Sequence, residues 1–157
     1  MLAIVIGSKS DLPIFQEALK LIKELPVKYE FKILSAHRTL DATVAYAKEA
    51  EKRGVKVIIA AAGASAALPG VISSCTTLPV IGVPIASTCL QGMDALLSMV
   101  QMPKNVPVGV VSIGEAGATN AILLALRIIS LQNIEIKNFL ERHKEEIRDK
   151  VLKEEIF

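Results

Sequence analysis

The chain has 157 residues, a formal net charge of +2 and an apolar fraction of 52%, which suffices for one domain with a sizeable core. The balanced charge and the 4% of aromatic residues argue against the basic, base-stacking groove of a nucleic-acid-binding protein. No apolar run reaches the roughly eighteen residues of a membrane span, and the short apolar N-terminus lacks a basic leader, so we expect neither a membrane segment nor a signal peptide. The high apolar fraction indicates that some apolar surface is buried against other subunits.

Cysteines and histidines are scarce. Cys75 and Cys89 are too few for a disulfide scaffold, and we interpret both as small buried apolar side chains in a reducing compartment. Without a cysteine pair, His37 and His143 make no plausible zinc site. We therefore expect no metal.

Short apolar runs alternate with helical patterns along the chain. The spacing of apolar residues predicts helices over residues 13–25 and 40–53, and residues 114–120 open a further helix. Strands are expected at residues 2–6, 29–34, 55–60, 80–83 and 108–113. Strands that are apolar at every position are covered on both faces, as in a parallel sheet between two layers of helices. We therefore predict a single-domain, doubly wound α/β sandwich with right-handed crossovers and a flavodoxin-like strand order.

Two segments depart from this plan. Residues 90–102 are apolar nearly all round, which predicts a helix buried on every side, one side against another subunit. Residues 134–156 are highly charged with one narrow apolar seam, which is typical of an amphipathic helix lying on its own or a neighbouring domain. We expect a nucleotide-binding catalytic domain over residues 1–130 and a helical extension over residues 131–157.

The segment after the first strand reads Gly7-Ser8-Lys9-Ser10-Asp11. Ligands of an open parallel sheet bind beyond the carboxyl ends of the strands, and a helix start with two hydroxyls attracts anions. Ser10 and Asp11 could equally serve only as helix caps. The loop matches neither the Walker loop nor GxGxxG, which favours a mononucleotide phosphate, with Asp11 as an acceptor for ribose hydroxyls.

The segments after the second and third strands carry the other candidates. Arg38 offers a fork that matches phosphate oxygens, and His37 beside it is a candidate acid/base group because a histidine gains or loses a proton near neutral pH. His143 is expected to be a solvated surface residue. Residues 60–70 are nearly all small, which lets the backbone approach a flat ligand, although close helix–sheet packing explains the composition equally well.

The motifs GSKSD, SAHRT, LPVIGVP, GMDALLSMVQMP, VPVG and AGATNA, with an alanine/glycine loop ending LPG, occur in this order. In this order and spacing the chain resembles the PurE family from about residue 4 to residue 129. SAHRT with VQMP is similar to the bacterial mutase class, whereas the carboxylase class typically has lysine after the histidine and a different glycine loop. The resemblance implies N5-carboxyaminoimidazole ribonucleotide mutase activity, an isomerisation in de novo purine biosynthesis.

The resemblance also implies roles for individual residues. His37 would move the proton at the imidazole ring carbon, and Asp11 would bind the ribose. Phosphate would be held by Ser8, Ser10, Ser35 and Arg38. The base and carboxylate would be contacted by the backbone around Gly63, Ala64, Ser65 and Ala66, and the substrate would also be bound by Ala36 and Leu68. By the same resemblance we expect no cofactor, a cytoplasmic homo-octamer with active sites near subunit boundaries, and functional coupling to the upstream ATP-dependent carboxyaminoimidazole ribonucleotide synthase.

The chain departs from the family pattern in the small-residue loop. The family loop usually reads GAGGAAHLPG, and here it reads AAGASAALPG. Ala67 therefore replaces a histidine, Ala61 and Ala64 replace glycines, and Leu40 replaces the proline that usually follows SAHRT. Two alternatives stay open: a carboxylase of aminoimidazole ribonucleotide or a related nucleotide that uses free carbon dioxide, and a nucleotide-binding protein without activity.

Overall fold

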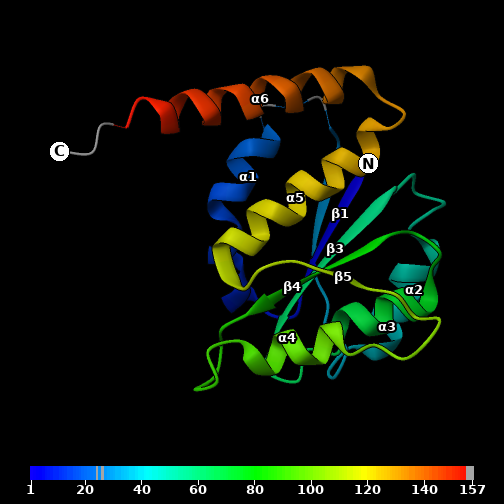
Figure 1. Ribbon diagram of the computed structural model, residues 1–157. Coiled ribbons are helices and arrows are strands. Elements are labelled where there is room, and N and C mark those ends of the chain that lie inside the picture. The colour runs from blue at the N-terminus through cyan, green and yellow to red at the C-terminus, as the bar shows by residue number, and fades with distance from the viewer. Residues whose placement is uncertain (24, 26, 155–157) are drawn as a thin grey trace.

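The computed structural model describes residues 1–23, 25 and 27–154, and its architecture is a parallel sheet between two layers of helices (Figure 1). The strands are β1 (Leu2–Ile6), β2 (Tyr29–Ile33), β3 (Val57–Gly63), β4 (Val80–Ile85) and β5 (Gly109–Val110). The helices are the 3₁₀ helix η1 (Lys9–Phe15) and α1 (Gln16–Lys23), α2 (Leu40–Glu49), α3 (Leu68–Cys75), α4 (Met93–Val100), α5 (Gly114–Ser130) and α6 (Ile134–Leu152).

The sheet has the order β2-β1-β3-β4-β5, and every neighbouring pair is parallel. This order confirms the doubly wound, flavodoxin-like prediction. It places β1 and β3 at the centre, where all five residues of β1 are buried. The carboxyl ends of β1, β2, β3 and β4 consequently meet at one edge, where the loops that follow them converge.

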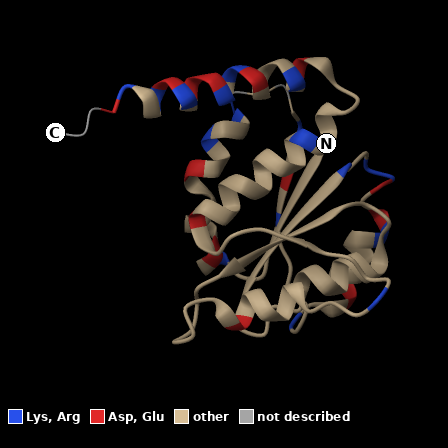
Figure 2. Cartoon of the chain, in the orientation of Figure 1, with Lys and Arg blue, Asp and Glu red and all other residues tan. Residues whose placement is uncertain are grey.

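Each face of the sheet has its own apolar core. Alternate residues of β1 point to opposite sides, so that Leu2, Ile4 and Ile6 pack with η1, α1 and α5, whereas Ala3 and Val5 pack with α2, α3 and α4. Half of the buried residues on the second side are alanines, and their small side chains bring the helices close to the sheet. Helix α6 lies outside α5 and extends past the body of the molecule, and charged residues are dense along it (Figures 1 and 2).

Several predicted boundaries were wrong, and local hydrogen bonds explain them. The expected helix over residues 13–25 starts at Lys9, because Ser8 and Asp11 form a capping box, and it begins as a 3₁₀ helix; residue 24 lies outside the described residues. Strand β3 starts at Val57 because the backbone N–H of Val55 is bonded to Ala50.

The small-residue segment was expected to be one loop. Instead, residues 60–63 belong to β3 and residues 68–75 form α3. The last strand contains two residues instead of the expected six. It lies at the edge of the sheet, where short strands limit pairing with other chains. The second helix ends at Glu49 instead of residue 53.

The two unusual segments also differ from the expectation. Helix α4 begins only at Met93, because Gln91 and Gly92 have positive φ angles of 53° and 86°. In the single chain, Ala95 and Met99 are buried but Met93, Leu97 and Val100 are exposed. The first part of α6 packs on the core of its own chain, where Ile136 is buried. Residues 155 and 156 of the expected helix lie outside the described residues.

Three side chains were placed wrongly from the sequence. Cys89 is exposed and Cys75 only half-buried, because Cys89 lies in the turn before α4 and Cys75 at the end of α3. His143 is half-buried and stacks on Phe139, with ring centroids 5.7 Å apart. Among the residues of the described ranges, no helix is long and apolar enough to cross a membrane.

Candidate active site

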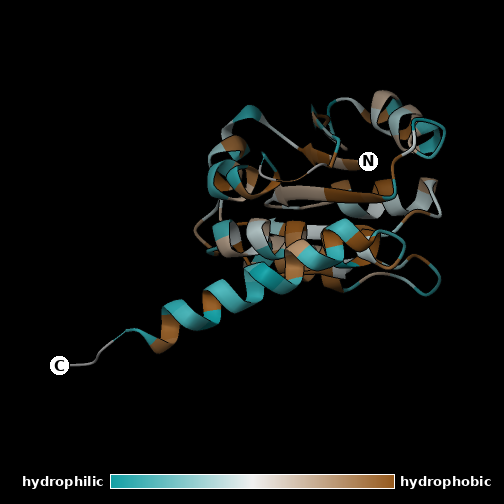
Figure 3. Ribbon diagram, turned by 90° about the horizontal axis from the view of Figure 1, so that it is seen from above, coloured by the Kyte–Doolittle hydropathy of each residue, from teal (hydrophilic) through white to brown (hydrophobic). Residues whose placement is uncertain are grey.

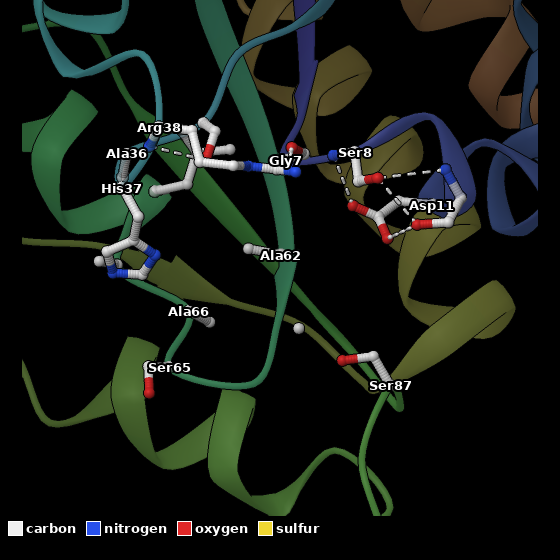
Figure 4. Close-up of a pocket in the computed structure, with 15 residues that line it drawn as sticks. Gly7, Ser8, Asp11, Ala36, His37, Arg38, Ala62, Ser65, Ala66 and Ser87 are labelled. Carbon is white, nitrogen blue, oxygen red and sulfur yellow. Dashed lines mark hydrogen bonds between the residues drawn. The ribbon is translucent and has the colours of Figure 1, made fainter.

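A pocket of about 390 Å³ opens at the carboxyl edge of the sheet, where the loops after β1, β2, β3 and β4 meet (Figure 4). The volume is within the range of small-molecule sites. The pocket is lined by Gly7, Ser8, Ser10, Asp11, Ser35, Ala36, His37, Arg38, Ala62, Gly63, Ser65, Ala66, Ala67, Leu68 and Ser87. The structure thus brings together the residues after three strands that the sequence analysis singled out.

The loop after β1 is held by its own hydrogen bonds. The Asp11 carboxylate accepts a hydrogen bond from the backbone N–H of Ser8 at 2.9 Å, and the Ser10 hydroxyl donates to the Ser8 hydroxyl at 2.9 Å. Asp11 is only 9% exposed. Burial raises the pKa of Asp11 above its ordinary value, although the hydrogen bonds from Ser8 and Ser10 and the charge of Arg38 act in the opposite direction. A buried acceptor-only carboxylate suits the recognition of hydroxyl donors.

Arg38 connects the loops after β1 and β2. Its Nη2 donates to the carbonyl oxygen of Gly7 at 2.8 Å, and its Nε donates to the hydroxyl of Ser35 at 3.3 Å. These bonds fix the plane of the guanidinium while leaving part of its fork of donors toward the pocket (Figure 4). Arg38 is therefore a preoriented cation at this end of the pocket, as oxyanion binding requires.

The His37 side chain leaves the loop after β2 in a different direction from that of Arg38 (Figure 4). The side chain of His37 is exposed and makes no hydrogen bond to another described residue. The imidazole faces the space bordered by Ala62 and Ala66 (Figure 4). Because the ring has no partner in the described part of the chain, both nitrogens can reach a bound molecule. This geometry fits an acid/base group at a wall of small apolar residues.

The small-residue loop turns sharply beside the pocket. Ala64 is the one predicted binding residue that is not among the lining residues, and its φ of 52° forms the turn between Gly63 and Ser65. Ala67 is the N-cap residue just before α3 and lines the pocket with a methyl group where the family loop has histidine. The binding role predicted for Ala64 stays a prediction.

Four lining residues were not among the predicted site residues: Gly7, Ala62, Ala67 and Ser87. Gly7 and Ala62 adjoin residues that were named, so their neighbours pointed to them. Ser87 follows β4, and the rule that ligands lie beyond the carboxyl ends of the strands could have found it, because β4 is a central neighbour of β3.

The described residues hold no group of three His, Cys, Asp or Glu side chains placed to bind a metal ion. Asp11 is the only carboxylate among the lining residues. The pocket therefore combines the oriented cation of Arg38, the buried acceptor of Asp11 and the imidazole of His37 with walls made of small side chains.

The parallel sheet and this pocket define a doubly wound α/β protein with a small-molecule site at its carboxyl edge. The model of the AIR carboxylase family matches residues 1–150. The chain belongs to this family.

Relatives and solved structures agree with this assignment. The chain is 52% identical over 151 residues to the N5-carboxyaminoimidazole ribonucleotide mutase of Pyrococcus horikoshii, covering 96% of this chain and 84% of that protein. It is 49% identical over 152 residues to the protein of the same name from Bacillus subtilis, covering 97% and 94%. A crystal structure of Treponema denticola PurE has a TM-score of 0.85 at 30% identity, covering 96% of this chain and 93% of that one.

Proposed function

We propose that this chain converts N5-carboxyaminoimidazole ribonucleotide into the isomer with the carboxyl group on the ring carbon, and that it does so in the pocket at the carboxyl edge of the sheet. The reaction is an isomerisation of purine biosynthesis, and relatives with about half of their residues identical are named for it. The observation that carries the assignment to this pocket is the arrangement of His37 against the small residues, with Arg38 and Asp11 on neighbouring loops.

The substrate is bound through its polar groups. Arg38 and the hydroxyls of Ser8, Ser10 and Ser35 hold the phosphate, and Asp11 accepts hydrogen bonds from the ribose. This leaves the base beside His37, with Ala36, Gly63, Ala64, Ser65, Ala66 and Leu68 around it. Support comes from the hydrogen bonds that preorient Arg38 and from the burial of Asp11.

The chemistry is a transfer of carbon dioxide within the pocket. The bond between the amine nitrogen and the carboxyl carbon breaks, the electron pair stays on nitrogen, and the nitrogen takes up a proton. The ring carbon then attacks the carbon dioxide, and the proton on that carbon is removed to restore aromaticity. One proton is taken up and one released, so His37 can serve both steps. Small apolar walls suit the retention of carbon dioxide next to the ring.

The reaction needs no group beyond the substrate and His37, so we propose turnover without a cofactor. We further propose a cytoplasmic homo-octamer that receives its labile substrate from the ATP-dependent carboxyaminoimidazole ribonucleotide synthase. The exposed apolar side chains of α4 support an assembly of several copies.

A turnover assay with the carbamate substrate tests the function. His37→Asn should keep nucleotide binding, because Arg38 and Asp11 remain, while kcat falls by about a hundredfold or more, the usual scale for general acid–base catalysis. His143→Asn is the matched control, since it changes the other histidine, away from the pocket, and kcat should stay within about twofold of the wild type.

The same assay separates the alternatives. Turnover only when bicarbonate is supplied with free aminoimidazole ribonucleotide would establish a carboxylase, and nucleotide binding without any turnover would establish an inactive binding protein. A near-normal kcat in His37→Asn would contradict the proton-transfer role of His37. It would leave the reaction assigned to the chain unchanged.

A further inference from the structure

Ser87 forms the wall of the pocket beyond Gly63. Its side chain points into the pocket (Figure 4), and its hydroxyl makes no hydrogen bond to any residue in the described ranges. The Ser10 hydroxyl already donates to Ser8, and the hydroxyls of Ser8 and Ser35, which accept hydrogen bonds from Ser10 and Arg38, lie in the loops proposed to hold the phosphate. The hydroxyl of Ser65 points away from the His37 ring (Figure 4). Ser87 is therefore a pocket hydroxyl outside the proposed phosphate-binding loops that is free to donate to a bound molecule.

The backbone around Ser87 is held in place although the side chain is exposed. The Thr88 hydroxyl donates to the Asp94 carboxylate at 2.7 Å and accepts from the backbone N–H of Leu90 at 3.1 Å. The hydrogen bond from Thr88 lowers the pKa of Asp94, so that this carboxylate stays charged. The backbone N–H of Ser87 donates to the carbonyl oxygen of Ile85 at 3.0 Å. The bond from Thr88 to Asp94 ties the turn to the first turn of α4, and the other two hold the turn locally.

Gly63 leaves the space that the Ser87 side chain occupies. A Cβ atom built on Gly63 would lie 2.0 Å from the Ser87 hydroxyl oxygen and 2.8 Å from its Cβ. The hydroxyl therefore lies against the backbone of Gly63 at the end of β3, in a pocket that is also lined by Ala62 and Ala66, whose side chains have no hydrogen-bonding group. At this wall, Ser87 therefore has a side-chain hydrogen-bond donor, which the two alanines lack.

We infer that the Ser87 hydroxyl donates a hydrogen bond to the carboxyl group that is transferred, an inference that rests on the proposed function. When the ring carbon attacks carbon dioxide, a carbon–carbon bond forms and one C=O electron pair moves onto oxygen, where negative charge develops. A donor already oriented toward that oxygen stabilises the transition state. The same bond holds neutral carbon dioxide beside the ring. Ser87 keeps its proton throughout, so the proton balance through His37 is unchanged.

The test follows an isotopic label in the carboxyl group of the carbamate substrate, with unlabelled bicarbonate in the buffer. In Ser87→Ala, kcat should fall about tenfold, the scale of one hydrogen bond to a charged group, while KM stays within about twofold. A smaller fraction of the label should remain in the product, because carbon dioxide escapes before recapture. Ser98→Ala is the matched control, since it removes a hydroxyl from α4 outside the pocket.

The outcomes separate this inference from the function on which it rests. If Ser87→Ala retains the label and the kcat of the wild type, the role of Ser87 is wrong and the mutase function stands. If Ser98→Ala lowers label retention as much as Ser87→Ala, the effect is structural and the inference is also wrong. No turnover of the carbamate by the wild type would overturn the function itself.

Discussion

Ala64 has a backbone conformation that costs free energy. Its φ of 52° lies in the left-handed region, where the Cβ of an L-residue approaches the following carbonyl oxygen at a cost of about 1 kcal/mol. The turn is kept by hydrogen bonds from the backbone N–H groups of Ala66 to Ala64 and of Ala67 to Ser65. The family pattern has glycine at this position, so the chain holds a strained residue next to the pocket.

Ala64→Gly should raise the free energy of unfolding by about 0.5–1 kcal/mol, because removal of the strain exceeds the added entropy of the unfolded chain. Ala61→Gly is the matched control at the other position where the family has glycine. Ala61 is fully buried in β3, so its replacement should lower the same free energy by about 1 kcal/mol. Urea unfolding at one fixed protein concentration measures both, and a loss of stability in Ala64→Gly would contradict the strain.

At the scale of elements, strand β2 is an outer strand of the sheet and is clamped to α2. Glu30 of β2 accepts hydrogen bonds from the Tyr46 hydroxyl of α2 and from Arg53 Nη2 at 3.0 Å. The Arg53 guanidinium lies 4.4 Å from the centre of the Tyr46 ring. Burial acts to raise the pKa of Glu30, but the hydrogen bonds from Tyr46 and Arg53 outweigh it and hold that pKa below its ordinary value of 4.5.

Glu30→Gln should lower the free energy of unfolding by about 1 kcal/mol at neutral pH, since the carboxylate is partly exposed and its bonds are discounted for solvent. Because the pKa of Glu30 is lower in the folded protein than in the unfolded chain, its charged form stabilises the fold above pH 4.5. This stabilisation is lost as the pH falls through the pKa that Glu30 has in the folded protein. The difference between variant and wild type should therefore shrink in acid. Glu17→Gln breaks an exposed pair with Lys20 and should change the free energy by less than about 0.5 kcal/mol. Equal effects of the two substitutions would contradict a stabilising role for the contacts of Glu30 with Tyr46 and Arg53.

At the scale of the whole molecule, two helices each leave several large apolar side chains exposed. Met93, Leu97 and Val100 lie on α4, and Ile147 and Val151 lie on the part of α6 that extends past the body (Figure 3). Exposed apolar groups of this kind mark interfaces. The α4 side chains are near the turn that carries Ser87, so an assembly through α4 would border the pocket.

Leu97→Glu should reduce the mass measured by light scattering at micromolar concentration, because a charge placed at an apolar interface is left unpaired. Leu97 is 50% exposed in the single chain. Leu131→Glu introduces the same charge at a more exposed leucine, 84% exposed, in the turn between α5 and α6, and should leave the mass unchanged. A wild-type chain that is monomeric at this concentration would refute the proposed octamer.

The amino-acid sequence by itself determined the alternation of elements, because apolar periodicity is a local property of the chain. Buried strands that alternate with helices also favoured the doubly wound strand order that the structure shows. The sequence also indicated His37, Arg38 and Asp11, since they follow strands and ligands bind beyond strand ends. The boundaries were less predictable. Hydrogen bonds such as Ser8 to Asp11, and the positive φ at Gly92, decide where helices begin.

Only the tertiary structure decided which side chains face the pocket together. Ser87 carries no motif, and it reaches the site because β4 pairs with β3 so that Ile85 lies opposite Gly63. The same pairing makes the missing Cβ of Gly63 the space for the Ser87 hydroxyl. Which of the small residues line the pocket and which, like Ala64, only turn the chain depends on contacts between strands distant in sequence, and local patterns do not encode those contacts.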